Sequence, residues 1–243
     1  IDESEFPDLE KYILHRLWEI DVVITDCVKN FNFHLMFTTL LNFCSNDLSS
    51  FYFDIRKDVI YCDGDKSKTR RSARTLLEII FNYLVRWLAP SLSFTTEEAW
   101  KAMGNQTSIH LEDFLHTPAK YENLKINENL KIIKQIRKVI TGALEIKRAE
   151  KLIGSSLEAH VDIYVESETL EKIKNYPLDE ISITSSFSLH VLTNDSQGFS
   201  LEDVADVKIA VSKTNGQKCQ RCWKYKEQLI RNEICERCDN AIA

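Results

Sequence analysis

Apolar residues recur every three or four positions through the first half of the chain, a spacing typical of amphipathic helices. Residues 7–30 place them on one face of a long helix, and Asn32 is positioned to cap a second helix. Residues 76–88 are apolar around most of a helix, which predicts a central position in a bundle and an end at Pro90. The pattern predicts a helical bundle over residues 1–120.

Two further helices are expected after this point. Thr95 and Thr96 precede two glutamates and predict the N-terminus of a short helix. Residues 121–155 hold a long amphipathic helix, from about 122 to 152, that links domains. Its polar face carries a basic stripe made up of Lys131, Lys134, Arg137, Lys138 and Arg148. A charged face of this kind is usually only solvated, so contact with a polyanion and simple exposure both stay open.

Beyond Gly154 the hydrophobic period changes from 3.6 to 2. Residues 157–165 alternate apolar and polar side chains as a half-buried strand does, and a short helix and two further alternating stretches follow. This order predicts a small α+β junction domain (β-α-β-β) over residues 156–215. The expected fold is therefore mainly α, with a helical bundle, this small domain and a C-terminal module at residues 216–243.

The C-terminal module contains the strongest chemical signal in the chain. Two C-x2-C pairs, separated by twelve residues, supply four thiols: Cys219, Cys222, Cys235 and Cys238. Two such knuckles can converge on one ion, whereas a redox C-x-x-C usually occurs singly. We expect a four-cysteine zinc knuckle or ribbon that binds one structural Zn²⁺ per chain, because four protein ligands leave no position open for catalysis. The other three cysteines, Cys27, Cys44 and Cys62, fall in apolar helical pattern and are expected in the core.

Charge is unevenly distributed along the 243 residues, whose formal net charge is −6. Residues 121–155 hold eight basic and four acidic side chains, and residues 216–243 hold six and four, whereas the other two segments are acidic. A polyanion would therefore meet local basic patches and not a general positive field. Lys and Arg alternate with Trp223 and Tyr225 in the last segment, which is typical of single-stranded nucleic-acid surfaces. A structural role for Trp223, covering the metal knuckle, stays open.

Length and composition exclude several classes. The 44% hydrophobic and 28% charged residues indicate a folded globular chain, and no stretch reaches the roughly 20 apolar residues of a membrane span. No signal peptide is recognisable, so we expect a cytoplasmic protein without a membrane partner. Because the chain opens on Ile1 and its first methionine is Met36, we expect it to begin inside a longer polypeptide. No phosphate-binding glycine loop, nucleophile elbow or paired-histidine motif is present, and this predicts no catalytic residues in this part of the chain.

Several segments resemble the anticodon-binding bundle of class I aminoacyl-tRNA synthetases of the isoleucyl, valyl and leucyl group. They are residues 51–58 (FYFDIRKD), 70–75 (RRSART) and 86–100 (RWLAPSLSFTTEEAW). Within that group, the junction and the cysteine module resemble the C-terminal part of bacterial-type isoleucyl-tRNA synthetases. The segments concerned are 151–159 (KLIGSSLEA), 218–223 (KCQRCW) and 235–238 (CERC).

The resemblance implies a parent enzyme, an isoleucine–tRNA ligase, that attaches isoleucine to tRNA(Ile) with ATP and edits mischarged valine. The catalytic motifs of that family are missing here, so ATP and Mg²⁺ would belong only to a catalytic domain outside this sequence. The segment itself is expected to bind the anticodon stem-loop of tRNA(Ile) as a monomer and not to catalyse the reaction.

Specific contacts can be predicted from the basic and aromatic residues. RNA loops are recognised through unstacked bases held on aromatic or Arg planes, while phosphate contacts position the backbone. We expect backbone contacts from Arg70, Arg71, Arg74, Arg137 and Arg148, and contacts near the bases from Arg221, Trp223 and Lys224. For Arg71 and Arg74, ion pairs with acids of the bundle are the structural alternative.

Two other functions remain open from the sequence. The zinc module could belong to a non-enzymatic protein that docks nucleic acid or another protein. The chain could also be the equivalent region of a valyl or leucyl enzyme.

Overall fold

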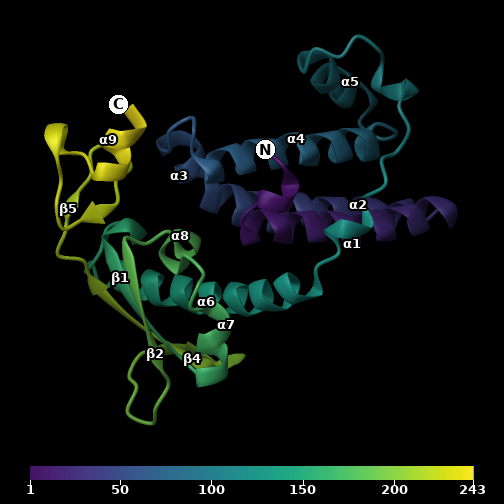
Figure 1. The fold of residues 1–243 in the computed structure, drawn as a ribbon. Helices are drawn as coiled ribbons and strands as arrows, with labels where there is room; N and C mark the ends of the chain where they lie inside the picture. Colours follow the sequence, from purple (N-terminus) through teal and green to yellow (C-terminus); the bar gives the residue numbers. More distant parts are fainter. Residues whose placement is uncertain (243) are drawn as a thin grey trace. The chain divides into compact units, whose positions relative to one another are not determined.

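The computed structural model describes residues 1–242, which form two compact units. The first comprises Ile1–Tyr52 and Lys66–Leu124, and the second comprises Phe53–Asp65 and the chain from Lys125 onward. Each unit is built from segments that are distant in sequence (Figure 1). The four-segment division predicted from the sequence has different bounds and stays a prediction. Its last residue, Ala243, lies outside the described residues.

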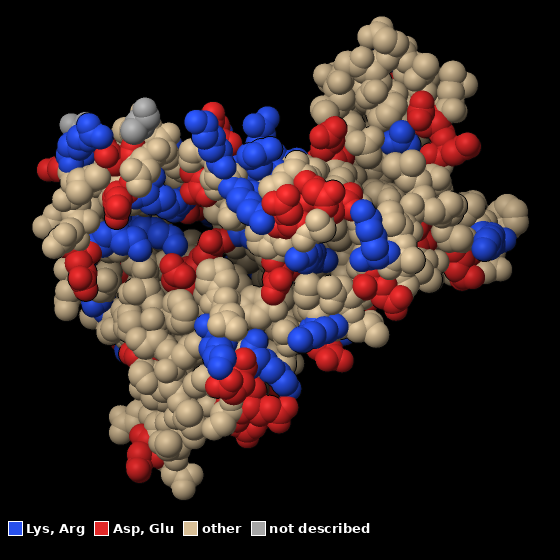
Figure 2. Space-filling view, viewed as in Figure 1, with Lys and Arg blue, Asp and Glu red and all other residues tan. Residues whose placement is uncertain are grey.

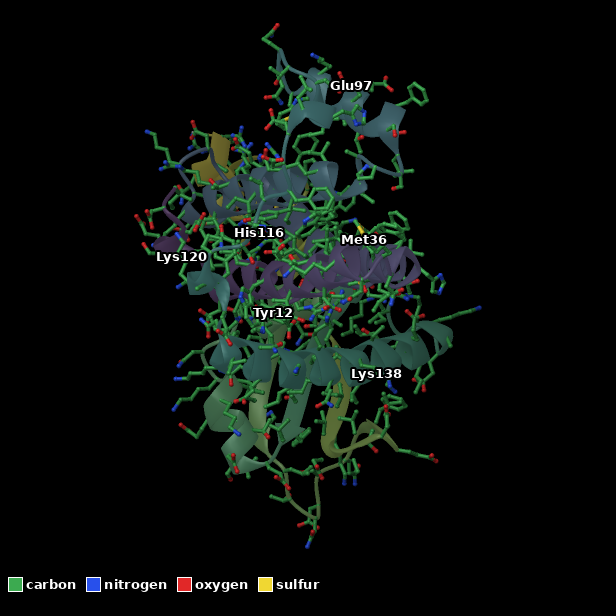
Figure 3. All side chains as sticks on the ribbon, turned by 90° about the vertical axis from the view of Figure 1, so that its right-hand side faces the viewer. Tyr12, Met36, Glu97, His116, Lys120 and Lys138 are labelled. Atoms are coloured by element: carbon green, nitrogen blue, oxygen red, sulfur yellow. The ribbon has the colours of Figure 1, made fainter. Side chains whose placement is uncertain are left out.

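The first unit is helical. Its main elements are α1 (Asp8–Lys29), α2 (Phe33–Asn42), α4 (Lys68–Leu88) and α5 (Ser93–Ala102). Helix α1 packs against both α2 and α4, and Ile13, Leu17, Leu76 and Trp87 of α1 and α4 are buried. Tyr12 on α1 and Met36 on α2 are also buried (Figure 3).

Helix boundaries follow local capping chemistry. The Asn32 side chain accepts a hydrogen bond from the backbone N–H of Leu35 at 3.3 Å, so the predicted cap of α2 is confirmed. The predicted cap at Thr95 is wrong, because α5 already begins at Ser93. The hydroxyl of Thr96 donates to the Leu92 carbonyl at 3.0 Å, so this side chain bonds back into the first turn and does not cap the helix.

Helical structure is continuous after α2 but changes its winding. A π-helical segment, Phe43–Phe53, leads into α3 (Asp54–Cys62). The hydrophobic spacing did not predict this wider winding. Helix α3 belongs to the second unit, and the polar residues after it form a break before α4.

The second unit contains a mixed four-stranded sheet in the order β2-β1-β4-β3. The strands are β1 (Ala159–Val165), β2 (Ser186–Val191), β3 (Phe199–Leu201) and β4 (Val204–Lys213). Strands β1 and β2 are parallel, while β4 is antiparallel to both β1 and β3. The short helices α7 (Ser167–Ile173) and α8 (Leu178–Ser182) connect β1 to β2.

The long helix α6 (Leu124–Ala149) belongs to the same unit and contacts its sheet (Figure 1). Gly142 of α6 permits this approach, since a Cβ atom there would lie 2.7 Å from the Phe199 ring. Alternate residues of β1, from Ala159 to Val165, are buried, which confirms the predicted alternation there. The predicted start at residue 157 is wrong, because Ser156–Glu158 form a 3-10 turn. The mainly α fold with a small α+β domain is confirmed, with one short helix and one short strand more than β-α-β-β.

The C-terminal module consists of a two-stranded hairpin, β5 (Gln217–Lys218) and β6 (Tyr225–Lys226), followed by α9 (Glu236–Ile242). Over residues 1–242, no helix is both long and apolar enough to cross a membrane.

Candidate metal centre and nucleic-acid surface

The four predicted ligands converge in the structure. Their sulfur atoms all lie within 4.8 Å of one another, and all four side chains are buried. The Sγ atoms of Cys222 and Cys235 are 3.8 Å apart. A tetrahedral ion with Zn–S bonds of about 2.3 Å separates its sulfurs by about 3.8 Å, so the donor set fits such an ion. These four thiols could hold a metal ion, and they are the cluster of this kind found within residues 1–242.

Backbone hydrogen bonds shape the first knuckle. The Trp223 N–H donates to the Cys219 carbonyl and the Cys219 N–H donates to the Lys224 carbonyl, both at 2.9 Å. This tight turn places Trp223 at φ 65°, in the left-handed region that residues with a Cβ seldom adopt. The Cys235 N–H donates to the Cys219 sulfur at 3.3 Å and links the two knuckles.

The electrostatic environment differs among the thiols. Burial raises the pKa of Cys219, but N–H groups of Cys222, Cys235 and Arg221 act in the opposite direction, and its pKa is lowered to about 6. Burial raises the pKa of Cys222 and of Cys238. A metal ion that binds here must therefore displace protons from the buried thiols.

Two arginines of the module contact helix α3. Arg221 donates to the backbone carbonyl of Cys62, and at 3.4 Å to that of Tyr61. Arg237 donates to Asp58 Oδ2 at 2.7 Å and to Asp63 Oδ1 at 2.6 Å. The predicted RNA-contacting residue Arg221 is thus engaged within the second unit, although its contact with RNA stays a prediction.

Helix α3 and the module also enclose a cavity of about 270 Å³. Its wall is mostly apolar and includes Tyr61, Leu157, Ile183 and Trp223, with Arg221 among the polar groups. Sequence reasoning missed this arrangement. Cys62 is buried, as expected, but it packs in one cluster with the four ligands, and this the sequence did not predict. The C-x2-C spacing carries no signal for a residue so distant in sequence.

Trp223 and Lys224 are neighbours with different surroundings. The Trp223 side chain is 60% exposed, and Lys218 Nζ lies 5.6 Å from its ring centroid. Lys224 is buried, and its ammonium is 3.1 Å from Asp179 Oδ2. Of the two, Trp223 presents a free surface, while Lys224 is held by a carboxylate.

The predicted contacts on α6 are both in ion pairs. Arg137 donates to Asp54 Oδ2 at 2.8 Å and to the Ile181 carbonyl at 2.9 Å. Arg148 is exposed and pairs with Glu145 one turn earlier. Lys138 of the same stripe pairs with Asp203 at 2.6 Å and is labelled on α6 in Figure 3. The stripe is therefore partly neutralised within its own unit.

The remaining three predicted contacts lie in the first two turns of α4, in the first unit. Arg71 and Arg74 are exposed and Arg70 is half-buried. Ser67 caps this helix by accepting from the Arg70 N–H at 3.3 Å. Figure 2 shows Lys and Arg interspersed with Asp and Glu over the visible face.

The sequence matches the model of one protein family, described as the anticodon-binding domain of tRNA ligase, over residues 10–163. This is more than half of the chain. The chain belongs to this family of anticodon-binding domains.

Curated relatives extend the likeness beyond the family match. This family member is similar to proteins named isoleucine–tRNA ligase from three bacteria. The identity is 40% to the protein of Ruegeria pomeroyi, 44% to that of Bartonella henselae and 41% to that of Pelagibacter ubique. The alignments cover 99%, 94% and 98% of the chain but 25%, 24% and 25% of the respective relatives. The chain thus spans about a quarter of the length of the relatives that it matches.

Proposed function

We propose that this chain is the tRNA-reading part of an isoleucine–tRNA ligase. The observation that carries the proposal is the similarity to ligases of that name along almost the whole chain, including the cysteine module. The parent enzyme would attach isoleucine to tRNA(Ile) with ATP and edit mischarged valine, using domains outside this sequence. The segment itself would bind the anticodon stem-loop, as a monomer and in the cytoplasm.

The metal we propose is one structural Zn²⁺ per chain. Four buried thiols at tetrahedral spacing support it, since soft thiolates favour zinc among the common divalent ions. The ion would close a module that is too small to bury a core of its own. Metal analysis of freshly purified, reduced protein tests this proposal: about one equivalent of zinc is expected, and much less would contradict it.

The RNA contacts fall into two groups. Arg71 and Arg74 are exposed, which supports phosphate contacts from the start of α4. Trp223 is exposed beside Lys218, which supports stacking with an unstacked base. Arg70, Arg137, Arg148, Arg221 and Lys224 complete the predicted surface. The internal contacts of Arg137, Arg221 and Lys224 favour a role in holding that surface in shape.

Binding of two tRNAs that differ only in the anticodon tests the function. Fluorescence anisotropy with the 243-residue chain should give tighter binding to tRNA(Ile) than to the same transcript carrying a methionine anticodon. Equal, weak affinity for both would contradict the proposal. That result would favour a general nucleic-acid or protein-docking module, which the closed zinc site alone also permits.

A further inference from the structure

Helix α3 ends against the cysteine module. The last carbonyl groups of an α-helix have no partner within the helix and need donors from elsewhere. Here Arg221 supplies them, since its guanidinium donates to the carbonyls of Tyr61 and Cys62. A cation at this position also interacts favourably with the negative end of the helix dipole.

Arg237 makes a second connection between the same two elements. Its guanidinium lies between the carboxylates of Asp58 and Asp63, and a third bond reaches the Asp58 carbonyl at 3.4 Å. Arg237 is partly buried, so solvent screens these pairs less than it screens pairs on an open surface. Gly64, just after α3, lies close to α9. A Cβ atom placed on it would be 3.5 Å from the backbone of Ala241, an ordinary van der Waals distance.

Arg221 also contacts the metal cluster. Arg221 lies inside the first knuckle, directly before the ligand Cys222, so one residue joins the metal cluster to the end of α3. Four thiolates around a divalent cation carry a net charge of −2, which attracts Arg221 strongly. Without the ion nothing ties the two knuckles to each other at this spacing, so Arg221 and Arg237 lose the fixed positions from which they reach α3.

We infer that the cysteine module and the C-terminal end of α3 form one cooperative unit, in which Arg221 and Arg237 are positioning residues and metal occupancy fixes the end of the helix. This inference rests on the metal site proposed above and is independent of the proposed RNA contacts. Metal loss then loosens residues 58–63, which directly precede the polar break before α4 and its three arginines.

Hydrogen–deuterium exchange of the full chain tests the inference. Removing the metal with a chelator should speed exchange of the backbone N–H groups of residues 59–63 by roughly tenfold or more, the change expected when charge-assisted bonds to the helix end are lost. Helix α1 of the first unit should keep its protection. Unchanged exchange at residues 59–63 after complete metal removal would overturn the inference.

Variants separate the arginines from the metal itself. Arg221→Gln with Arg237→Gln should speed the same exchange while the protein still holds one equivalent of metal. The control is Arg231→Gln, which removes an ion pair with Asp239 inside the module and leaves α3 untouched. If residues 59–63 of the metal-loaded double variant exchange as slowly as in the original chain, Arg221 and Arg237 are not positioning residues.

A further pair of variants guards against misfolding of the double variant. Asp58→Asn with Asp63→Asn removes the partners of Arg237 from the helix side and should reproduce the effect of Arg237→Gln. Combining the two aspartate substitutions with Arg237→Gln should speed exchange little more than either set does alone. Fully additive effects would contradict the contact between Arg237 and the two aspartates. Zinc content and tRNA anisotropy are measured on the same samples, so failure of the metal or RNA proposal is seen separately from failure of this one.

Discussion

At the scale of single residues, Trp223 combines an unusual backbone with an unusual exposure. The tight knuckle holds it at positive φ, and more than half of its side chain faces solvent although a large apolar ring gains stability from burial. The backbone conformation belongs to the knuckle, whereas the exposed ring adds little to the stability of the fold. Lys218 beside the ring adds a cation to a flat apolar surface, the combination on which a nucleotide stacks.

We therefore predict that Trp223→Ala weakens tRNA binding. Loss of one base–aromatic stack costs about 1–3 kcal/mol, or roughly 5–150-fold in dissociation constant. Anisotropy with tRNA(Ile) measures the change, and the metal content should stay at one equivalent. Phe94→Ala, which removes a ring that is 91% exposed on α5, is the matched control and should bind normally. Equal affinity of Trp223→Ala and the unmodified chain would exclude the stacking role.

Asn32 has a purely structural role at the same scale. Its side-chain oxygen caps α2, and Asn32→Ala leaves the Leu35 N–H without that acceptor. Loss of an N-cap lowers the free energy of unfolding by about 0.5–2 kcal/mol. Urea unfolding followed by circular dichroism measures it, and Asn32→Asp, which retains an acceptor oxygen, should unfold like the original chain. Similar destabilisation by both substitutions would mean that the capping bond is not the cause.

At the scale of elements, the cysteine module depends on the protonation of its ligands. Because burial raises the pKa of Cys222 and Cys238, these thiols are protonated near neutral pH when no metal is bound. Metal binding releases those protons, so zinc affinity should fall as the pH is lowered and rise as it is increased. Cys219, with a pKa of about 6, contributes to this dependence only below that pH.

Competition with a chromophoric chelator between pH 6 and pH 8 measures this prediction. Each thiol that must lose a proton changes the affinity by roughly tenfold per pH unit, so a change of about a hundredfold per unit is expected from Cys222 and Cys238 alone. The proton affinity of the chelator is corrected for with a zinc standard. An affinity that does not vary over this range would mean that the metal-free thiols are already ionised.

Elements differed in how well the sequence predicted them. Helices α1, α4 and α6 follow from hydrophobic periodicity, and the metal ligands follow from spacing, because both signals are local. The start of α5, the π-helical winding before α3 and the strand β3 depend on tertiary packing. The contact of Arg237 with Asp58 and Asp63 joins residues far apart in sequence. No local pattern distinguishes such an arginine from one that faces solvent, and for the same reason the internal contacts of Arg221 and Arg137 were not predicted.

At the scale of the whole molecule, a net charge of −6 must be reconciled with binding a polyanion. Many basic side chains are already paired internally, as Arg137 is with Asp54 and Lys138 with Asp203. Only the unpaired ones can replace the counterions of RNA. The salt dependence of the affinity for tRNA should therefore reflect a few phosphate contacts and not the total number of Lys and Arg residues.

We predict that the affinity for tRNA falls only weakly, but measurably, as the salt concentration rises, and that Arg71 and Arg74 account for part of this dependence. For single-stranded RNA, each phosphate contact contributes about −0.7 to the slope of log affinity against log salt concentration. Removing Arg71 and Arg74 together should make the slope shallower by about 1.4 and weaken binding to all tRNAs alike, because phosphate contacts carry no sequence information. Lys138→Ala, whose ammonium is already paired, is the control and should leave the slope as it is. An unchanged slope in the double variant would mean that other residues make the phosphate contacts. If the double variant keeps its preference for one anticodon over another, the residues that recognise the bases lie outside α4.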